Sequence, residues 1–277
     1  MASNYECCDE KKKSFHRSAY HPSNRNCFVH YQNVLHEALG HGGACILVGG
    51  TPLVLSSAHF DCDYASVSDA GRRFVAAAGT LVNFIAAYFF WRAFHSKRVT
   101  SPALRYFYWF AMSGNFFVAA GYPLFSGVIG VGDWVNVVEG WQPVWFWRLL
   151  LAIIGFLLYM FGVWFALREM KTLIGADPSD RLMRAFKLTL LPYLAGATIS
   201  SLGAWFNPIG TFVVFTSAAA AFGGSSAFAW MSQMPQTNWF PERSDELVTI
   251  ARSWIWVMIA ILLAFFHIFV LGPGVEL

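Results

Sequence analysis

Apolar residues dominate this chain in stretches long enough to cross a lipid bilayer. Seven such stretches follow a polar segment at residues 1–27. Each matches a hydrocarbon core of about 30 Å, so each predicts a membrane-spanning helix. The turn at Asn207-Pro208 either separates two spans or belongs to a single re-entrant excursion. The predicted spans lie at about 28–49, 74–94, 105–131, 146–167, 187–205, 209–231 and 253–272.

The third stretch contains residues that interrupt a helix. Pro123 lacks a backbone donor, and the glycines that follow it permit irregular backbone before Asp133. Such backbone is tolerated at membrane depth when it lines a cavity. The pattern therefore predicts an all-α fold: a polytopic transmembrane helical bundle of about seven spans with a broken third helix.

Composition supports a membrane protein and indicates its orientation. Of the 277 residues, 56% are hydrophobic and only 13% are charged, which is too apolar for an ordinary soluble domain. The net charge of +3 comes from basic residues gathered in particular loops, so it reports topology and not a nucleic-acid partner. Most lysines and arginines fall on one side of the predicted membrane, and only Arg72, Arg73 and Arg148 fall on the opposite side. Because basic residues gather on the cytoplasmic side, the N-terminus is predicted to be cytoplasmic and the C-terminus to lie on the opposite side.

The cysteines and the connecting loops add little chemistry. Their spacing resembles neither a zinc ribbon nor a disulfide framework, so we expect no disulfide scaffold. Cys7 and Cys8 precede a run of lysines and could be acylated, but we favour a plain polar tail with two free thiols. The connection Thr51–Arg73 carries polar residues that fit a solvated loop better than a second metal site.

The first predicted span contains the candidate metal ligands and the candidate general base. It places His36, Glu37 and His41 inside an apolar segment, where polar side chains are costly and usually mark a site. Histidine and glutamate on one helix are what a catalytic zinc site uses, with imidazoles on the metal and the carboxylate as general base.

The spacing of the two histidines requires a distorted helix. His36 and His41 are five positions apart, which puts them about 140° apart on a regular α-helix. A π-bulge would widen one turn and bring both imidazoles to one metal. Alternatively, Glu37 and His41 share a face of a regular helix and His36 is an outer partner. We favour the bulge.

A third ligand must come from another span. Asp133 has the best context because it ends the irregular stretch after the third span, although a surface aspartate after a flexible turn remains the alternative. His95 is predicted to be interfacial, and His267 fits a packing histidine better than a ligand.

Residues 30–135 resemble the site-2 protease family of intramembrane zinc metalloproteases. The resemblance rests on the sequence from His36-Glu37 to His41-Gly42, on Gly79-Thr80-Leu81-Val82-Asn83 and on Asp133. The second element is similar to that family's G-P-x-x-N sequence with Thr80 in place of proline. The aspartate stands in Gly-Asp-Trp where the family has Leu-Asp-Gly.

The resemblance implies a function and a division of the chain. It implies Zn²⁺ held by His36, His41 and Asp133, Glu37 as general base, Asn83 near the substrate backbone, and a transmembrane protein segment as substrate. An interhelical hydrogen bond explains Asn83 equally well. The alternative function is a catalytically inactive relative that acts as a binding or assembly factor. The predicted regions are a polar cytoplasmic tail at 1–27, a three-span metalloprotease-like core at 28–135 and additional helices of unknown role at 136–277.

Overall fold

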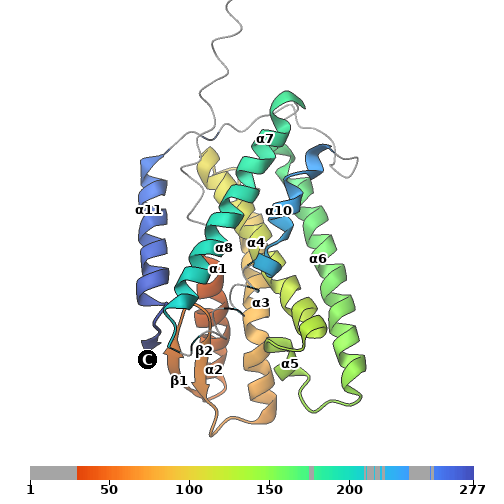
Figure 1. Cartoon of the computed structure of the whole chain (residues 1–277), viewed down its shortest axis with the longest axis vertical. Helices are drawn as coiled ribbons and strands as arrows, with labels where there is room; N and C mark the ends of the chain where they lie inside the picture. The colour runs from red at the N-terminus through yellow and green to blue at the C-terminus, as the bar shows by residue number, and fades with distance from the viewer. Residues whose placement is uncertain are drawn as a thin grey trace, which may run out of the picture.

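The computed structural model describes residues 30–174, 178–208, 222–236 and 253–277, with isolated positions between them. The predicted polar tail, with Cys7 and Cys8, lies outside these residues. The described chain is mostly helical, in agreement with the prediction. The elements, drawn in Figure 1, are α1 (His30–Val34), η2 (Leu35–Gly42), α2 (Gly43–Leu47), β1 (Thr51–Leu55), β2 (Phe60–Asp63), α3 (Asp69–Phe94), α4 (Pro102–Ile129), α5 (Asp133–Val137), α6 (Val144–Ile174), α7 (Pro178–Leu188), α8 (Leu190–Trp205), α10 (Ala227–Met231), η3 (Met234–Gln236), α11 (Trp254–Phe265), η4 (Phe266–Val270) and β3 (Val275–Glu276).

Two of the described helices are long and apolar enough to cross a membrane. They are α3, with 26 residues, and α6, with 31 residues; Trp254–Val270 forms a shorter apolar helix. At 1.5 Å per residue α3 and α6 extend about 39 and 46 Å. Large apolar side chains on α6 and α11 face outward, among them Phe156, Leu157 and Ile255, as expected of a surface in contact with lipid.

Helix α4 forms the centre of the bundle. It packs between α3 and α6 and buries large aromatic side chains completely. Phe110 stacks on Phe228 of α10 with ring centroids 4.4 Å apart, and the Trp109 indole donates to the Ala166 carbonyl of α6 over 3.0 Å. These contacts fix the helix from which the segment with Asp133 continues.

The predicted break in the third helix lies at a different place. Helix α4 continues through Pro123 and ends at Ile129, because a proline within a helix removes one hydrogen bond without having to end the helix when its neighbours support it. The chain turns instead at Gly130 and Gly132, whose φ angles are 82° and 99°. Only glycine adopts such angles readily. Helix α5 begins directly afterwards at Asp133.

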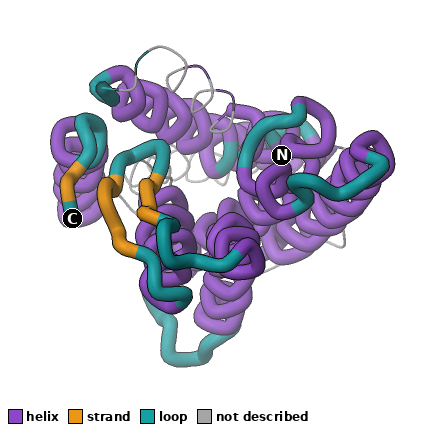
Figure 2. Tube along the Cα trace, turned by 90° about the horizontal axis from the view of Figure 1, so that it is seen from below, coloured by secondary structure: helices purple, strands orange, loops and turns teal. Residues whose placement is uncertain are grey.

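A small sheet and a disulfide replace the predicted solvated loop. Strand β1 pairs with β2 and with β3 in the order β2-β1-β3, all antiparallel. Figure 2 shows this sheet beside the helices and close to the C-terminus. Cys45 of α2 and Cys62 of β2 form a disulfide, so the expectation of no disulfide was wrong. The two cysteines are 17 residues apart and only the hairpin brings them together, which their spacing alone does not indicate.

The two ends of the bundle carry different elements. The hairpin β1–β2, helix α5 and the C-terminus lie at one end, whereas α7 lies at the other (Figure 1). Helix α3 begins at the hairpin end, where Ser68 accepts a hydrogen bond from the Gly71 amide and caps it. Asp133, the first residue of α5, therefore lies near the end that carries the sheet.

Candidate metal centre

The polar segment of the first span forms a π-helix. Element η2 runs from Leu35 to Gly42, between the short α-helices α1 and α2. The wider turn brings residues five positions apart onto one side. His36 and His41 are both buried, and their ring centroids are 4.8 Å apart. The predicted widening of the helix is therefore confirmed.

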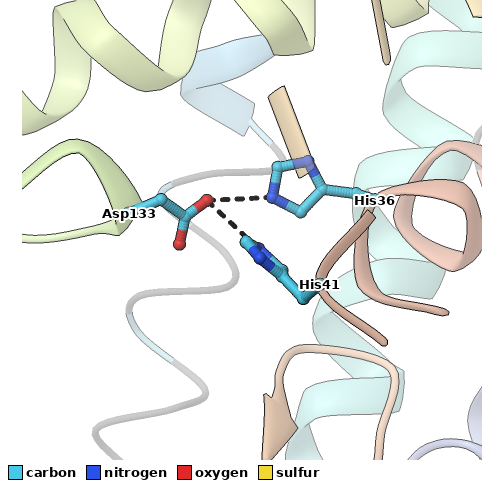
Figure 3. Close-up of side chains that lie close together, drawn as sticks. All are labelled: His36, His41 and Asp133. Atoms are coloured by element: carbon cyan, nitrogen blue, oxygen red, sulfur yellow. Dashed lines mark hydrogen bonds and ion pairs between the residues drawn. The ribbon is translucent and has the colours of Figure 1, made fainter. Parts of the chain in front are cut away.

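Both imidazoles point toward Asp133 (Figure 3). The Nε2 atoms of His36 and His41 lie 3.0 and 3.4 Å from the same carboxylate oxygen. The ligand atoms of the three residues all lie within 4.8 Å of one another, so this group could hold a metal ion. The surface alternative for Asp133 does not apply, since its side chain is only 21% exposed and faces the histidines.

The other nitrogen of each ring is bonded to a fixed acceptor. His36 Nδ1 lies 2.7 Å from Asn83 Oδ1, and His41 Nδ1 lies 2.7 Å from the Val75 carbonyl oxygen. The carbonyl can only accept, so His41 carries a proton on Nδ1. Asn83 donates from its own nitrogen to Asn115 Oδ1 over 2.7 Å, which leaves its oxygen to accept from His36. In the neutral form of each ring, the Nε2 atom that faces Asp133 therefore carries the lone pair.

The converging lone pairs favour a bound cation. Burial raises the pKa of the Asp133 carboxyl, but when no cation is bound, hydrogen bonds donated by the two imidazoles outweigh burial and hold that pKa below its usual value. Two imidazole lone pairs and a carboxylate repel one another unless a proton or a cation lies between them. The arrangement of acceptors thus suits a divalent metal ion.

The donor set and spacing fit zinc. Two nitrogens and one oxygen match a catalytic zinc site, in which three protein ligands leave one position open. Ligands about 2.1 Å from a tetrahedral metal are about 3.4 Å from each other. The observed Nε2–Oδ2 distances of 3.0 and 3.4 Å are close to that separation. His36, His41 and Asp133 are thus the residues that would hold the ion.

Glycines allow η2 and α3 to approach closely. A Cβ on Gly79 would lie 2.5 Å from the imidazole ring of His36, and a Cβ on Gly40 would lie 2.5 Å from the Cα of Gly79. Neither position can carry a larger side chain without a shift of the backbone or of the ligand. The glycine of the Gly79-Thr80 sequence therefore provides the space for the His36 ring.

Helix α3 also holds the segment with Asp133. The Trp134 indole donates to Thr80 Oγ1 over 3.0 Å, and the Arg73 guanidinium donates to the carbonyls of Val137 and Glu139. These bonds fix both ends of α5. Asp133 is therefore positioned by the glycine turn before it and by side chains of α3 beside it.

Glu37 lines one cavity together with two of the three candidate ligands. This cavity has a volume of 510 Å³ and includes Glu37, His41 and Asp133 in its wall. Glu37 is buried, with 7% of its surface exposed. A carboxylate that shares a cavity wall with candidate metal ligands is placed to act as a base.

Asn83 adopts the interhelical arrangement. Its side chain is completely buried and bonds to His36 and Asn115. Asn115 in turn donates to the Ala111 carbonyl within α4 over 2.8 Å. Both polar atoms of the Asn83 side chain are thus engaged by η2 and α4, which favours its support of a metal ligand over contact with a substrate backbone.

Tyr122 was not singled out from the sequence. Its ring stacks on the His36 imidazole with centroids 4.3 Å apart and 17° between the planes, and it lines the cavity. A tyrosine within an apolar helix has no spacing signal that marks it as part of a site. The other two histidines considered lie elsewhere: His95 pairs with Glu169 at 2.9 Å, and His267 is buried in η4 next to Gly203.

Comparison of the chain with protein-family models, with curated proteins and with solved structures found no match. The resemblance to site-2 proteases therefore remains a prediction from the motifs. The geometry of the His36–His41–Asp133 group is the observation on which a function can be based.

Proposed function

We propose that this protein is an intramembrane zinc metalloprotease, which hydrolyses a peptide bond in or near a transmembrane segment. One observation carries the proposal. His36, His41 and Asp133 direct three ligand atoms to one point, and Glu37 lines the same cavity in a chain with membrane-length apolar helices. The motif resemblance to site-2 proteases supports this choice among zinc-dependent reactions.

The residues of the chain would divide the chemistry among them. Zinc, when bound, polarises the scissile carbonyl and lowers the pKa of water toward neutrality. Glu37 accepts the proton of the attacking water and delivers it to the leaving amine. The Nδ1 bonds of His36 and His41 keep both rings in the tautomer that a metal requires.

The proposed substrate is a partly unwound transmembrane segment, because an intact helix hides its amides. Most residues around the cavity belong to the first three predicted spans or to the segments at the hairpin end, so the reaction would take place near the end of the bundle that carries the sheet. The disulfide Cys45–Cys62 at that end supports the proposed orientation, since disulfides persist on the oxidising side of a membrane. The N-terminus would then be cytoplasmic and the C-terminus on the opposite side.

The Glu37→Gln variant tests the proposal. It removes the base and leaves the ligand set intact, so we expect it to bind about one zinc ion per chain and to lose cleavage of a helix-destabilised membrane substrate. The matched control is His41→Ala, which should lose both zinc and cleavage. Cleavage by Glu37→Gln at the rate of the unsubstituted chain would remove the general-base assignment.

The alternative is an inactive relative that acts in binding or assembly. Its main support was the five-residue spacing of the histidines. The π-helix weakens this support, because the Nε2 atoms of both rings lie close to Asp133 although the histidines are five positions apart. A zinc-loaded protein that cleaves no helix-destabilised substrate would favour the alternative.

A further inference from the structure

Tyr122 of α4 lies directly beside one of the candidate metal ligands. Its ring stacks on the His36 imidazole, with ring centroids 4.3 Å apart and 17° between the planes. His36 is held in turn by the bond between its Nδ1 and Asn83, and α4 packs between α3 and α6. The position of the phenol ring relative to the candidate metal centre is therefore fixed by the packing of the bundle.

The hydroxyl of Tyr122 is open to the cavity. It has no hydrogen-bond partner in the described part of the chain, yet it is not one of the unpaired polar atoms that the described residues enclose. Tyr122 lines the cavity together with Glu37 and Asp133, and the charges of both carboxylates act on its phenol. A molecule that occupies the cavity can therefore meet this hydroxyl beside the candidate metal centre.

Packing against His36 does not account for the hydroxyl. A phenylalanine ring would stack on the imidazole equally well, whereas most polar side-chain groups inside proteins have a hydrogen-bond partner. A phenol has a pKa of about 10 in water, so it keeps its proton at neutral pH and can donate a hydrogen bond. A donor that is held rigidly beside a candidate zinc site is suited to a substrate oxygen on which negative charge develops.

We propose that Tyr122 is a catalytic residue, whose hydroxyl donates a hydrogen bond to the scissile carbonyl oxygen as that oxygen becomes an oxyanion. This inference rests on the proposed function. Attack of water forms the new C–O bond and moves an electron pair onto the carbonyl oxygen, and the pair returns when the C–N bond breaks. Glu37 carries the proton from water to the leaving amine, so Tyr122 keeps its own proton throughout. The hydrogen bond is strongest in the transition state, so it raises kcat with little effect on KM.

The Tyr122→Phe variant tests the proposal, because it removes the hydroxyl and keeps the ring that stacks on His36. Cleavage of a synthetic transmembrane peptide with a central Gly-Gly pair is measured with zinc-loaded protein in lipid nanodiscs. We expect kcat to fall about 100-fold or more and KM to stay within about twofold. Zinc affinity should not change, because the stack and the bond between His36 and Asn83 remain.

A second measurement does not depend on turnover. A phosphinate version of the same peptide has a tetrahedral phosphorus with charged oxygens at the scissile position, so it mimics the transition state and is not cleaved. Its dissociation constant should rise about tenfold or more in Tyr122→Phe. The dissociation constant of the ordinary peptide, measured in the Glu37→Gln background with and without Tyr122→Phe, should not change.

Tyr64→Phe is the matched control. Tyr64 also lines the cavity, but its ring faces Arg72, with the guanidinium carbon 5.9 Å from the ring centroid, and does not stack on a candidate ligand. We expect Tyr64→Phe to keep the kcat and the phosphinate affinity of the unsubstituted chain. Losses in Tyr64→Phe that Tyr122→Phe does not show would assign the donor to Tyr64 and overturn the proposal.

The outcomes separate the role of Tyr122 from the proposed reaction. If the unsubstituted chain cleaves the peptide, an unchanged kcat or an unchanged phosphinate affinity in Tyr122→Phe would overturn the role and retain the protease. Loss of zinc from Tyr122→Phe would also overturn it, because the phenol would then support the metal and not the substrate. Phosphinate binding that depends on Tyr122, without any cleavage, retains the donor and removes the protease. Absence of both cleavage and phosphinate binding would remove both.

Discussion

Trp134 Nε1 donates a hydrogen bond to Thr80 Oγ1 across 3.0 Å and joins α5 to α3 beside Asp133. Each residue stands where the chain departs from the site-2 protease pattern: Thr80 replaces the motif proline, and Trp134 follows the aspartate in place of glycine. The two residues that differ from the motif therefore contact each other. Proline could not accept this bond, and glycine could not donate it.

Removal of this hydrogen bond should weaken metal binding. Thr80→Val keeps the shape of the side chain and removes the acceptor, so the start of α5 and its ligand Asp133 lose one constraint. Partners that orient metal ligands commonly contribute tenfold or more to metal affinity, so we expect zinc affinity to fall about tenfold. Competition with a zinc chelator measures the change.

A double-substitution cycle provides the control. Trp134→Phe removes the donor of the same bond and should cost a similar factor. Because either change abolishes the one interaction, the Thr80→Val/Trp134→Phe pair should bind zinc about as well as either single variant. If the two losses instead multiply, the residues act independently and the hydrogen bond does not position Asp133.

Gly79 is expected to tolerate no side chain. Gly79→Ala places a Cβ 2.5 Å from the His36 ring, so the ring must turn away from Asp133 or α3 must move. We expect loss of stoichiometric zinc binding and a lower unfolding temperature, as overpacking usually costs about 1–3 kcal/mol. Zinc content after gel filtration and thermal unfolding in detergent give the two measurements.

Gly43→Ala is the matched control for Gly79→Ala. Gly43 begins α2, directly after the π-helix, and a Cβ there meets nothing within 4 Å. Replacement of glycine by alanine within a helix stabilises it by about 0.5–1 kcal/mol. Gly43→Ala should thus bind zinc normally and unfold at the same or a higher temperature. Normal zinc binding by Gly79→Ala would show that the His36 ring does not need this space.

Asn83→Ala distinguishes support of a ligand from contact with a substrate. The change removes the partner of His36 Nδ1 and one hydrogen bond to Asn115. We expect zinc affinity to fall about 10–100-fold. Asn33→Ala, which removes another amide from the cavity wall but no imidazole partner, should leave zinc affinity unchanged. A rise in KM at full zinc occupancy would instead assign Asn83 to the substrate.

The sequence was sufficient to single out the three side chains that converge in the structure. Polar groups inside an apolar stretch are rare, so His36, Glu37 and His41 stood out without structural knowledge. The five-residue spacing left two helical geometries open, and η2 adopts the one with the wider turn. Asp133 was identified because few other acidic residues follow an apolar stretch, and its side chain does lie against both imidazoles.

The sequence was insufficient where the outcome depends on contacts between distant segments. Pro123 usually marks a break, but packing between α4 and α6 keeps the helix continuous, and the turn falls at Gly130 and Gly132 instead. Tyr122 of α4 stacks on His36 of η2, a contact between segments far apart in the sequence. Such side chains carry no periodicity or motif that would indicate their place.

The disulfide between Cys45 and Cys62 should stabilise the hairpin end of the fold. It closes a segment of 17 residues, and the loop-entropy estimate for a segment of that size is about 3 kcal/mol. Addition of reductant should therefore lower the unfolding temperature of the purified protein. The Cys45→Ser/Cys62→Ser pair is the control, since its lower unfolding temperature should not change with reductant. If reductant lowered the unfolding temperature of both proteins equally, the change would come from other cysteines, and this would contradict the Cys45–Cys62 disulfide.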